Sequence, residues 1–224
     1  MAAGLEIHLR DRGVASRPKV KSGAIAGIIL AGGASRRMGS PKALLQFQGE
    51  TFLDRLIRIF SDIADPVIVV VGHHADAIRS GAQRSSEAIF AVNSAPERGM
   101  LSSLQCGLAA VPESAEAVMF TPVDHPHLDS STLERIISDF QAKHAPVTVP
   151  VYGGKHGHPV CVSKAVAAEL RSLPPEAQAS DIIHRHVNQT SYVEVPDSAI
   201  LTDVDDPAAY AELIRGQSPG ERSL

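Results

Sequence analysis

The sequence is poor in residues on which several classes of protein depend. No tryptophan occurs among its 224 residues, and aromatic residues make up only 4%, which argues against a surface that stacks nucleic-acid bases. The formal net charge is −4, so the chain has no overall positive field for nucleic acid. No apolar run reaches the length that spans a membrane. We therefore expect neither a nucleic acid nor a membrane as a partner.

Cysteine is equally scarce. Cys106 and Cys161 are the only two, and they show neither the spacing of a metal site nor a disulfide framework. Residues 1–22 lack the apolar core of a signal peptide, and a reducing, cytoplasmic setting is the simplest expectation. We expect a mobile N-terminal leader over 1–22, a single domain over 23–215 and a flexible tail over 216–224.

Short apolar runs alternate with segments of helical spacing through the first two thirds of the chain. The runs at 25–31, 66–71, 89–92 and 117–123 are typical of buried strands. Their alternation with helices predicts a three-layer α/β/α, Rossmann-like fold around a mostly parallel sheet. From residue 145 the pattern changes, because a Gly- and His-rich loop separates two strand-like runs. We predict a β-hairpin, and hence an antiparallel element, in the C-terminal half.

Residue types also predict where several elements begin. Thr51 is expected to cap a helix that buries Phe52, Leu53, Leu56, Ile57 and Phe60, and Ser131 is expected to cap another. A helix is expected over about the second half of 99–111. Residues 200–204 are expected to end a strand. Asp206 and Pro207 would then begin the last helix.

The most informative stretch follows the first apolar run. This run ends in Gly32-Gly33, and Arg36, Arg37 and Lys42 follow within ten residues. Glycine lets the backbone approach a ligand closely, and clustered cations favour phosphate. Neither GxxxxGK[ST] nor GxGxxG is present. We predict a strand that delivers a polyphosphate-binding loop in which Arg37 and Lys42 neutralise charge and Arg36 faces solvent. A merely solvated basic loop is the alternative, which the glycine pair disfavours.

Other polar residues follow the remaining strands. Ligands of parallel sheets bind at the carboxyl ends of the strands, and the segments predicted there are 32–42, 72–74, 93–103 and Asp124. Ser102 and Ser103 can offer hydroxyl groups to a base or ribose; a helix cap at Ser102 or Ser103 is the alternative role. Asp124 and an acid from Asp203, Asp205 and Asp206 would suit Mg²⁺, which takes a few carboxylates together with phosphate and water. Helix capping is the alternative role for those three acids.

The histidines form two His-x-His pairs, 125/127 and 156/158. Zinc usually requires three or four ligands with fixed spacing. Because nothing in the sequence indicates that the two pairs meet, we disfavour zinc and interpret His158 as a residue that shapes a substrate site.

Residues 29–42, ILAGGASRRMGSPK, resemble the LA(A/G)GxSxRMGxxK signature of nucleotidyltransferases with a GT-A-like α/β fold. Within the MobA-like NTP transferase superfamily, the chain resembles the molybdenum cofactor nucleotidyltransferases, most closely the cytidylyltransferase branch. Further segments that support the resemblance are 72–73, 93–104, 123–126, 157–160 and 201–207. The last resembles the family's terminal D-x-D-T-P element, with Asp206 in place of Thr.

The resemblance implies a role for each matching position. Arg37, Lys42 and Asp124 would be catalytic, Asp124 and Asp205 would bind Mg²⁺, and His158 and Pro159 would contact the acceptor. The nucleotide-binding set would be Leu30, Ala31, Gly32, Gly33, Arg37, Met38, Gly39, Lys42, Gly72, Asn93, Gly99, Ser102 and Ser103. The implied reaction is attack by the terminal phosphate of molybdopterin on the α-phosphate of CTP, with release of pyrophosphate. A molybdoenzyme or its chaperone is a further implied partner.

The two segments that would contact the base favour different nucleotides. Ala31-Gly32-Gly33 has the form familiar in the guanylyltransferase branch, whereas 99–104 resembles the cytidylyl form. We favour CTP because the Gly157-His158-Pro159 element also favours it. The alternatives are GTP with the same acceptor, transfer to another phosphorylated acceptor such as a sugar or alcohol phosphate, and a carrier without catalytic activity. The intact Arg37, Lys42 and Asp124 argue against the carrier.

Overall fold

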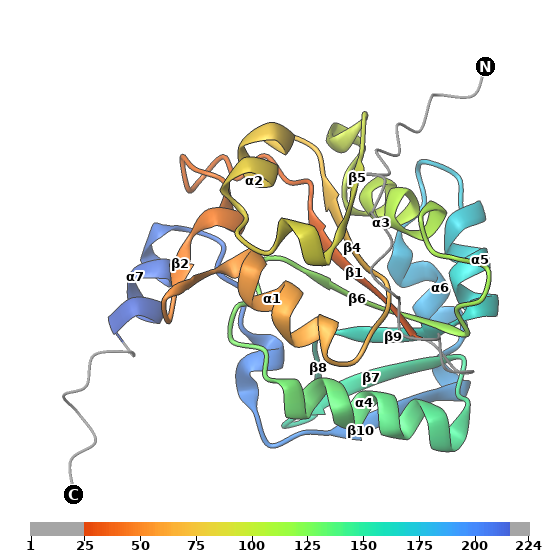
Figure 1. Cartoon of the computed structure of the whole chain (residues 1–224). Helices are drawn as coiled ribbons and strands as arrows, with labels where there is room; N and C mark the ends of the chain where they lie inside the picture. The colour runs from red at the N-terminus through yellow and green to blue at the C-terminus, as the bar shows by residue number, and fades with distance from the viewer. Residues whose placement is uncertain (1–24, 216–224) are drawn as a thin grey trace, which may run out of the picture.

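The computed structural model describes residues 25–215 (Figure 1). The expected leader at 1–22 and the expected tail at 216–224 lie outside the described residues. The strands are β1 (Ile25–Ala31), β2 (Gln46–Phe47), β3 (Glu50–Thr51), β4 (Val67–Val71), β5 (Ile89–Val92), β6 (Ala117–Pro122), β7 (Val147–Tyr152), β8 (Lys155–His156), β9 (Val160–Ser163) and β10 (Thr190–Glu194). The helices are α1 (Phe52–Ser61), α2 (Ala75–Gly81), α3 (Met100–Ala109), α4 (Ser130–Lys143), α5 (Lys164–Ser172), α6 (Ala179–Arg185) and α7 (Pro207–Arg215).

One mixed sheet organises the described chain. Its order is β10-β7-β9-β6-β1-β4-β5, with β8 paired to β7, while β2 and β3 form a separate small ribbon. The pairs of β1 with β4 and β6, of β4 with β5, and of β7 with β10 are parallel. Strand β9 is antiparallel to both β6 and β7, and β8 is antiparallel to β7. The predicted three-layer α/β/α fold and its antiparallel C-terminal element are confirmed.

Helices cover both faces of the sheet, and alternation along β1 explains the two cores. Ile29 and Ala31 belong to one core, with α1 and α4, whereas Ile28 and Leu30 belong to the other, with α3 and α5. Because side chains of a strand alternate between faces, a strand covered on both faces must be apolar throughout, and all seven residues of β1 are buried. Figure 1 shows α3, α5 and α6 gathered on one side of the sheet.

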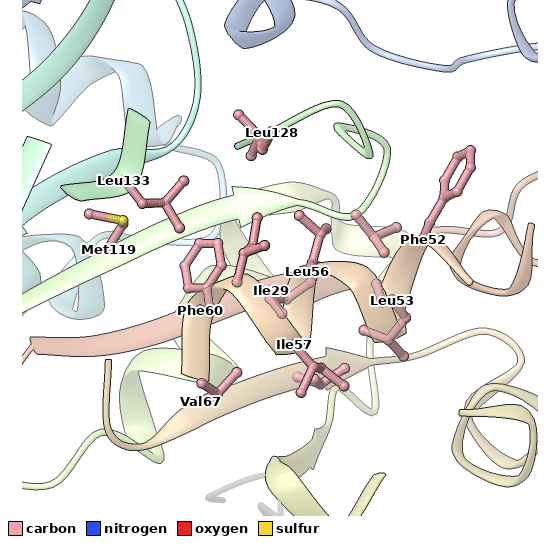
Figure 2. Close-up of a cluster of buried hydrophobic side chains, with 14 of the residues drawn as sticks. Ile29, Phe52, Leu53, Leu56, Ile57, Phe60, Val67, Met119, Leu128 and Leu133 are labelled. Carbon is pink, nitrogen blue, oxygen red and sulfur yellow. The ribbon is translucent and has the colours of Figure 1, made fainter. Parts of the chain in front are cut away.

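Helix α1 shows how the sequence forms this core. Thr51 accepts a hydrogen bond from the backbone N–H of Asp54, which confirms the predicted cap. All five predicted apolar positions are buried. They pack with Ile29, Val67 and Met119 of the sheet (Figure 2).

Three predicted boundaries were wrong. Asp129, not Ser131, caps α4, because its carboxylate accepts from the Ser131 N–H. Helix α3 begins at Met100, directly after Gly99, instead of midway through 99–111. Residues Ser198–Leu201 form the 3-10 helix η5 instead of a strand, since Asp197 accepts from the Ala199 N–H and turns the chain there. The predicted Asp206 cap is confirmed, because its carboxylate accepts from the N–H groups of Ala208 and Ala209.

The loop between β8 and β9 is fixed against η5. Gly157 N–H donates to the Pro150 carbonyl at 3.0 Å and His158 N–H donates to the Ile200 carbonyl at 3.0 Å. A Cβ at Gly157 would lie 2.3 Å from the Ile200 carbonyl oxygen. Only glycine therefore allows these two backbones to approach so closely.

We expect Gly157→Ala to lower the free energy of unfolding by about 1–3 kcal/mol, because backbone atoms must move to accept the methyl group. Chemical denaturation measures the change. Gly33→Ala is the control, since no described atom lies within 4 Å of a Cβ there, and it should stay within about 0.5 kcal/mol of the parent. Equal stability of the two variants would contradict the close contact.

Candidate active site

The loop after β1 turns sharply before it returns to the sheet edge. Ser35 adopts a left-handed conformation with φ 48°, and its carbonyl accepts from the N–H groups of Met38 and Gly39. Its hydroxyl accepts from the Lys42 N–H at 3.1 Å. This turn places Lys42 at the start of a short 3-10 helix and directs the segment toward the ends of β1 and β6.

Four charged side chains meet there and form what we call the ion cluster: Arg37, Lys42, Asp124 and Asp205. Lys42 Nζ donates to Asp124 Oδ2 at 3.0 Å and to Asp205 Oδ1 at 2.6 Å. Arg37 donates to Asp205 Oδ2 at 3.0 Å. The side chains of Lys42 and Asp124 are 13% and 20% exposed, whereas those of Arg37 and Asp205 are 64% and 41% exposed. Lys42 and Asp124 thus form the interior of the cluster and Arg37 its rim.

Asp205 reaches this cluster through a backbone contact. The Val204 N–H donates to the Asp124 carbonyl at 2.9 Å, and the Val204 side chain is buried in the core. The segment after η5 is therefore fastened to the end of β6, although it forms no strand. This contact brings together two carboxylates that lie 81 positions apart.

The ion cluster shifts the pKa values of Lys42 and Asp205 in opposite directions. Burial lowers the pKa of Lys42, but hydrogen bonds and charge interactions with Asp205 and Asp124 outweigh it, and the net direction is upward. The hydrogen bond from Lys42 is the main cause that lowers the pKa of Asp205. Opposite charges therefore keep both groups ionised at neutral pH.

A divalent cation fits the two carboxylates only with additional ligands. Both carboxylates accept from Lys42 Nζ. Asp124 Oδ2 and Asp205 Oδ1 therefore lie no further apart than the sum of their distances to that nitrogen. Within residues 25–215, no three His, Cys, Asp or Glu side chains gather closely enough to hold a metal ion alone. Phosphate and water oxygens would have to complete the shell, which is the arrangement that Mg²⁺ prefers.

A cavity of about 400 Å³ opens beside the ion cluster. Its walls include the predicted residues Leu30, Ala31, Gly32, Gly33, Arg37, Lys42, Gly99, Ser103, Asp124 and Asp205. The other predicted residues lie elsewhere: Met38, Gly39, Gly72, Asn93, Ser102, His158 and Pro159 do not line it. Arg36, expected to face solvent, is exposed at the cavity edge. Pro96, Met100 and Ile78 also line the cavity and were not predicted, because an apolar residue type does not distinguish a cavity wall from the core.

Asn93 and Gly72 do not line the cavity, but they contact residues that do. The buried Asn93 amide donates to Ser102 Oγ at 2.9 Å and to Ser103 Oγ at 3.1 Å. Ser103 in turn faces Gly32, where a Cβ would lie 2.9 Å from its Oγ. A Cβ at Gly72 would lie 2.8 Å from the Gly32 carbonyl. Asn93 and Gly72 therefore determine where Ser103 and the glycine loop lie, without contact with the cavity.

Two histidines, the buried His125 and the partly buried His158, lie next to the ion cluster. The His125 ring centroid is 4.9 Å from that of His158, and His125 Nε2 is 4.0 Å from Asp124 Oδ1. In the described chain, Nδ1 of each ring is buried without a hydrogen-bond partner. Burial lowers both pKa values, that of His158 to about 4. Both rings are therefore neutral near pH 7, and sequence reasoning did not predict their contact.

The depressed pKa of His158 predicts a loss of stability in mild acid. Its folded-state pKa lies below the unfolded value of 6.5, so its contribution is complete above pH 6.5 and is lost as pH falls toward 4, by up to about 3 kcal/mol. Unfolding free energies from pH 7.5 to 4.5 measure the slope. His158→Gln should flatten it, and an unchanged slope in that variant would show that His158 is not responsible.

None of the helices described between residues 25 and 215 has the length and apolar character that a membrane span needs.

The fold and the geometry of the glycine loop agree with the result of a comparison with known protein families. Residues 27–190 match the model of the MobA-like NTP transferase domain, and the chain belongs to this family of nucleotidyltransferases.

Individual relatives carry several names. The chain is 28% identical over 195 residues to a probable molybdenum cofactor guanylyltransferase of Bacillus cytotoxicus, covering 85% of this chain and 96% of the relative. It is 26% identical over 184 residues to the molybdenum cofactor cytidylyltransferase of Escherichia coli K12, covering 82% of this chain and 92% of the relative. It is also 29% identical over 205 residues to the bifunctional protein GlmU of Bifidobacterium longum, of which it spans only 43%.

Among solved structures, Rv0371c of Mycobacterium tuberculosis H37Rv superposes with a TM-score of 0.76 at 27% identity, covering 87% of this chain and all of that one. A second structure of Rv0371c is a complex with manganese. It superposes with a TM-score of 0.70 at 26% identity, covering 86% of this chain and 98% of that one.

Proposed function

We propose that this nucleotidyltransferase moves CMP from CTP to the terminal phosphate of molybdopterin and releases pyrophosphate. The observation that carries the proposal is the ion cluster at the rim of the cavity, where two cations and two carboxylates converge from separate parts of the chain. A nucleoside triphosphate with its cation presents the matching charges. The names of two full-length relatives support molybdenum cofactor as the acceptor.

In this proposal the loop binds and orients the triphosphate. Lys42 and Arg37 leave their carboxylate partners and hold phosphate oxygens, which neutralises the charge that develops on the departing pyrophosphate. The backbone from Gly32 to Ser35 approaches the nucleotide closely, because Gly32 and Gly33 have no side chains there. The chain forms no covalent intermediate; positioning and charge stabilisation supply the catalysis.

Asp124 and Asp205 would hold Mg²⁺, which stabilises charge on the transferring phosphate. Their oxygen ligands and partial exposure suit a hard cation that keeps some of its water. The manganese complex of Rv0371c supports a divalent ion in this fold. The product would pass to a molybdoenzyme or its chaperone in the cytoplasm.

The choice of base is the finer part of the proposal. Gly157-His158-Pro159 and residues 99–104 favour CTP, whereas the Gly32-Gly33 form and the guanylyltransferase relative favour GTP. Gly32 is central, because it lets Ser103 stand at the cavity wall in a position held by Asn93.

Gly32→Ala tests this point. The added Cβ would lie 2.9 Å from Ser103 Oγ, so Ser103 must shift and weaken its bond to Asn93. We expect the ratio of kcat/KM for CTP to that for GTP to change by about 10-fold or more, which corresponds to about 1.4 kcal/mol. Competition between the two nucleotides, with mass measurement of the product, gives the ratio. An unchanged ratio would remove Gly32 from base selection.

The acceptor has a specific alternative, a sugar or alcohol phosphate. Parallel assays with molybdopterin and with simple sugar phosphates separate the two, since only the true acceptor yields a nucleotide conjugate of the expected mass. A conjugate formed with a sugar phosphate and not with molybdopterin would overturn the acceptor while leaving nucleotidyl transfer intact.

A further inference from the structure

Three charged groups of the ion cluster come from segments that also adjoin the small β2–β3 ribbon. Lys42 lies in the 3-10 helix just before the ribbon. Asp124 follows β6, and Asp205 precedes α7. Figure 1 shows β2 beside α7. The ribbon is therefore placed to fix the three segments relative to one another, apart from the charges themselves.

The turn after Asp124 is held by α1 and by the ribbon. Arg55 Nε of α1 donates to the carbonyl of the buried Pro126 at 2.7 Å. The Arg55 guanidinium lies over the ring of Phe47 of β2, 5.2 Å from its centroid. The His127 ring meets the same Phe47 ring edge-on, with centroids 5.2 Å apart. These contacts fix the chain directly beyond Asp124.

Helix α7 is fastened to the same ribbon on the other side. The Tyr210 hydroxyl donates to the Gln46 carbonyl of β2 at 3.0 Å, and the Tyr210 ring meets that of Phe52 edge-on, with centroids 6.0 Å apart. Asp206 caps the first turn of α7, so the helix begins directly after Asp205. A rotation of α7 would therefore move Asp205 as well.

The ion pairs cannot fix the two carboxylates during the proposed reaction. Lys42 and Arg37 then leave Asp124 and Asp205 for the triphosphate, and the exposed pair of Arg37 with Asp205 contributes little in any case. The backbone bond from Val204 to Asp124 remains, but a single bond allows the segment to pivot. Because Mg²⁺ requires a nearly ideal octahedral arrangement of ligands, a pivot of one carboxylate would weaken its binding.

We propose that Arg55 and Tyr210 are positioning residues of the nucleotidyl transfer, which set the separation of the two metal carboxylates through the β2–β3 ribbon. Arg55 acts through Asp124, and Tyr210 acts through Asp205. The inference rests on the proposed function, in which these carboxylates hold the divalent cation. Neither Arg55 nor Tyr210 lines the cavity beside the ion cluster, so neither would contact the nucleotide.

Tyr210→Phe is the first test, because it removes the hydroxyl group and keeps the ring. We expect kcat and the Mn²⁺ affinity, measured by electron paramagnetic resonance in the presence of CTP, each to fall about 10-fold, as when a group that orients a metal ligand is lost. The KM for CTP should stay within about 2-fold. Arg55→Met keeps the apolar stem and should have the same effects, and Arg55→Lys, which retains a donor, should recover part of the loss.

Combination with Asp205→Asn separates positioning from a general loosening of the fold. If Tyr210 acts through Asp205, Tyr210→Phe should lower Mn²⁺ affinity by less than about 2-fold once Asp205 is already Asn, since residues that act together are not additive. An equal loss in both backgrounds would overturn the inference.

Two matched controls carry the same residue types at other places in the fold. Tyr192→Phe removes a hydroxyl group from the edge strand β10. Arg79→Met removes an arginine of α2 that also lies over a phenylalanine ring, 5.7 Å from the centroid of Phe90. Both should keep Mn²⁺ affinity within about 2-fold of the parent, because neither changes the ribbon or the ion cluster.

The outcomes distinguish the inference from the proposed function. If Asp205→Asn lowers Mn²⁺ affinity but Tyr210→Phe and Arg55→Met do not, the inference fails and the proposed function stands. If Asp205→Asn itself leaves Mn²⁺ affinity unchanged, the metal assignment of the proposed function fails, and the inference fails with it.

Discussion

Asp124→Asn is expected to lower kcat by about 1,000-fold, while CTP binding measured without metal changes by only a few fold. The substitution removes a carboxylate from the interior of the ion cluster but keeps its shape. A loss of about 4 kcal/mol corresponds to this factor and is the scale of one metal's charge stabilisation. Pyrophosphate release gives kcat, and calorimetric titration gives nucleotide affinity. Mn²⁺ affinity, measured by electron paramagnetic resonance in the presence of CTP, should fall as well.

The matched control is Asp203→Asn. Asp203 is exposed and lies two residues before Asp205, so the variant removes a charge of the same sign near the ion cluster without a change in the cluster itself. We expect it to retain turnover within about 3-fold. Unchanged turnover and Mn²⁺ affinity in Asp124→Asn would show that Asp124 is not a metal ligand.

Lys42→Met is expected to lower kcat/KM for the nucleotide by about 100- to 1,000-fold. The Lys42 side chain is 13% exposed and its ammonium contacts both carboxylates, and it is the cation best placed to reach a triphosphate that enters the cavity. A cation that stabilises developing charge in a partly enclosed site contributes about 3–4 kcal/mol. Steady-state kinetics with varied CTP measures the loss.

Arg98→Met serves as the control for Lys42, because Arg98 is an exposed cation in the 3-10 helix Pro96–Arg98, just before α3. Its kcat/KM should remain within about 3-fold of the parent. If both variants lose activity equally, the nucleotide is attracted by a diffuse positive field, and Lys42 makes no specific contact with the triphosphate. If neither loses activity, the loop does not hold the triphosphate.

The glycine loop was predictable because its signal is local. A buried strand, a glycine pair and three cations fall within eighteen residues, and each residue type has one main physical use there. Asp124 was placed near the loop by the rule that parallel strands present their carboxyl ends at one edge, and the structure brings it to Lys42.

Asp205 shows the limit of that rule. The sequence predicted an acid at a strand end, but the segment is not a strand. It reaches the ion cluster through the bond from Val204 to Asp124, a contact between distant positions that periodicity and residue type cannot reveal. The contact of His125 with His158 is hidden for the same reason. The cap of α4 was predicted wrongly for a different reason. Asp129 and Ser131 are both good capping residues, and only packing selects between them.

Pyrophosphate release with paired substrates tests the central claim most directly. The parent protein would be incubated with Mg²⁺ and each of the four nucleoside triphosphates, with and without molybdopterin. We predict rapid release only with CTP and molybdopterin together, in equal amount with a product that contains CMP. Release with GTP in place of CTP would contradict the choice of base, and no release with any pair would contradict nucleotidyl transfer to molybdopterin itself.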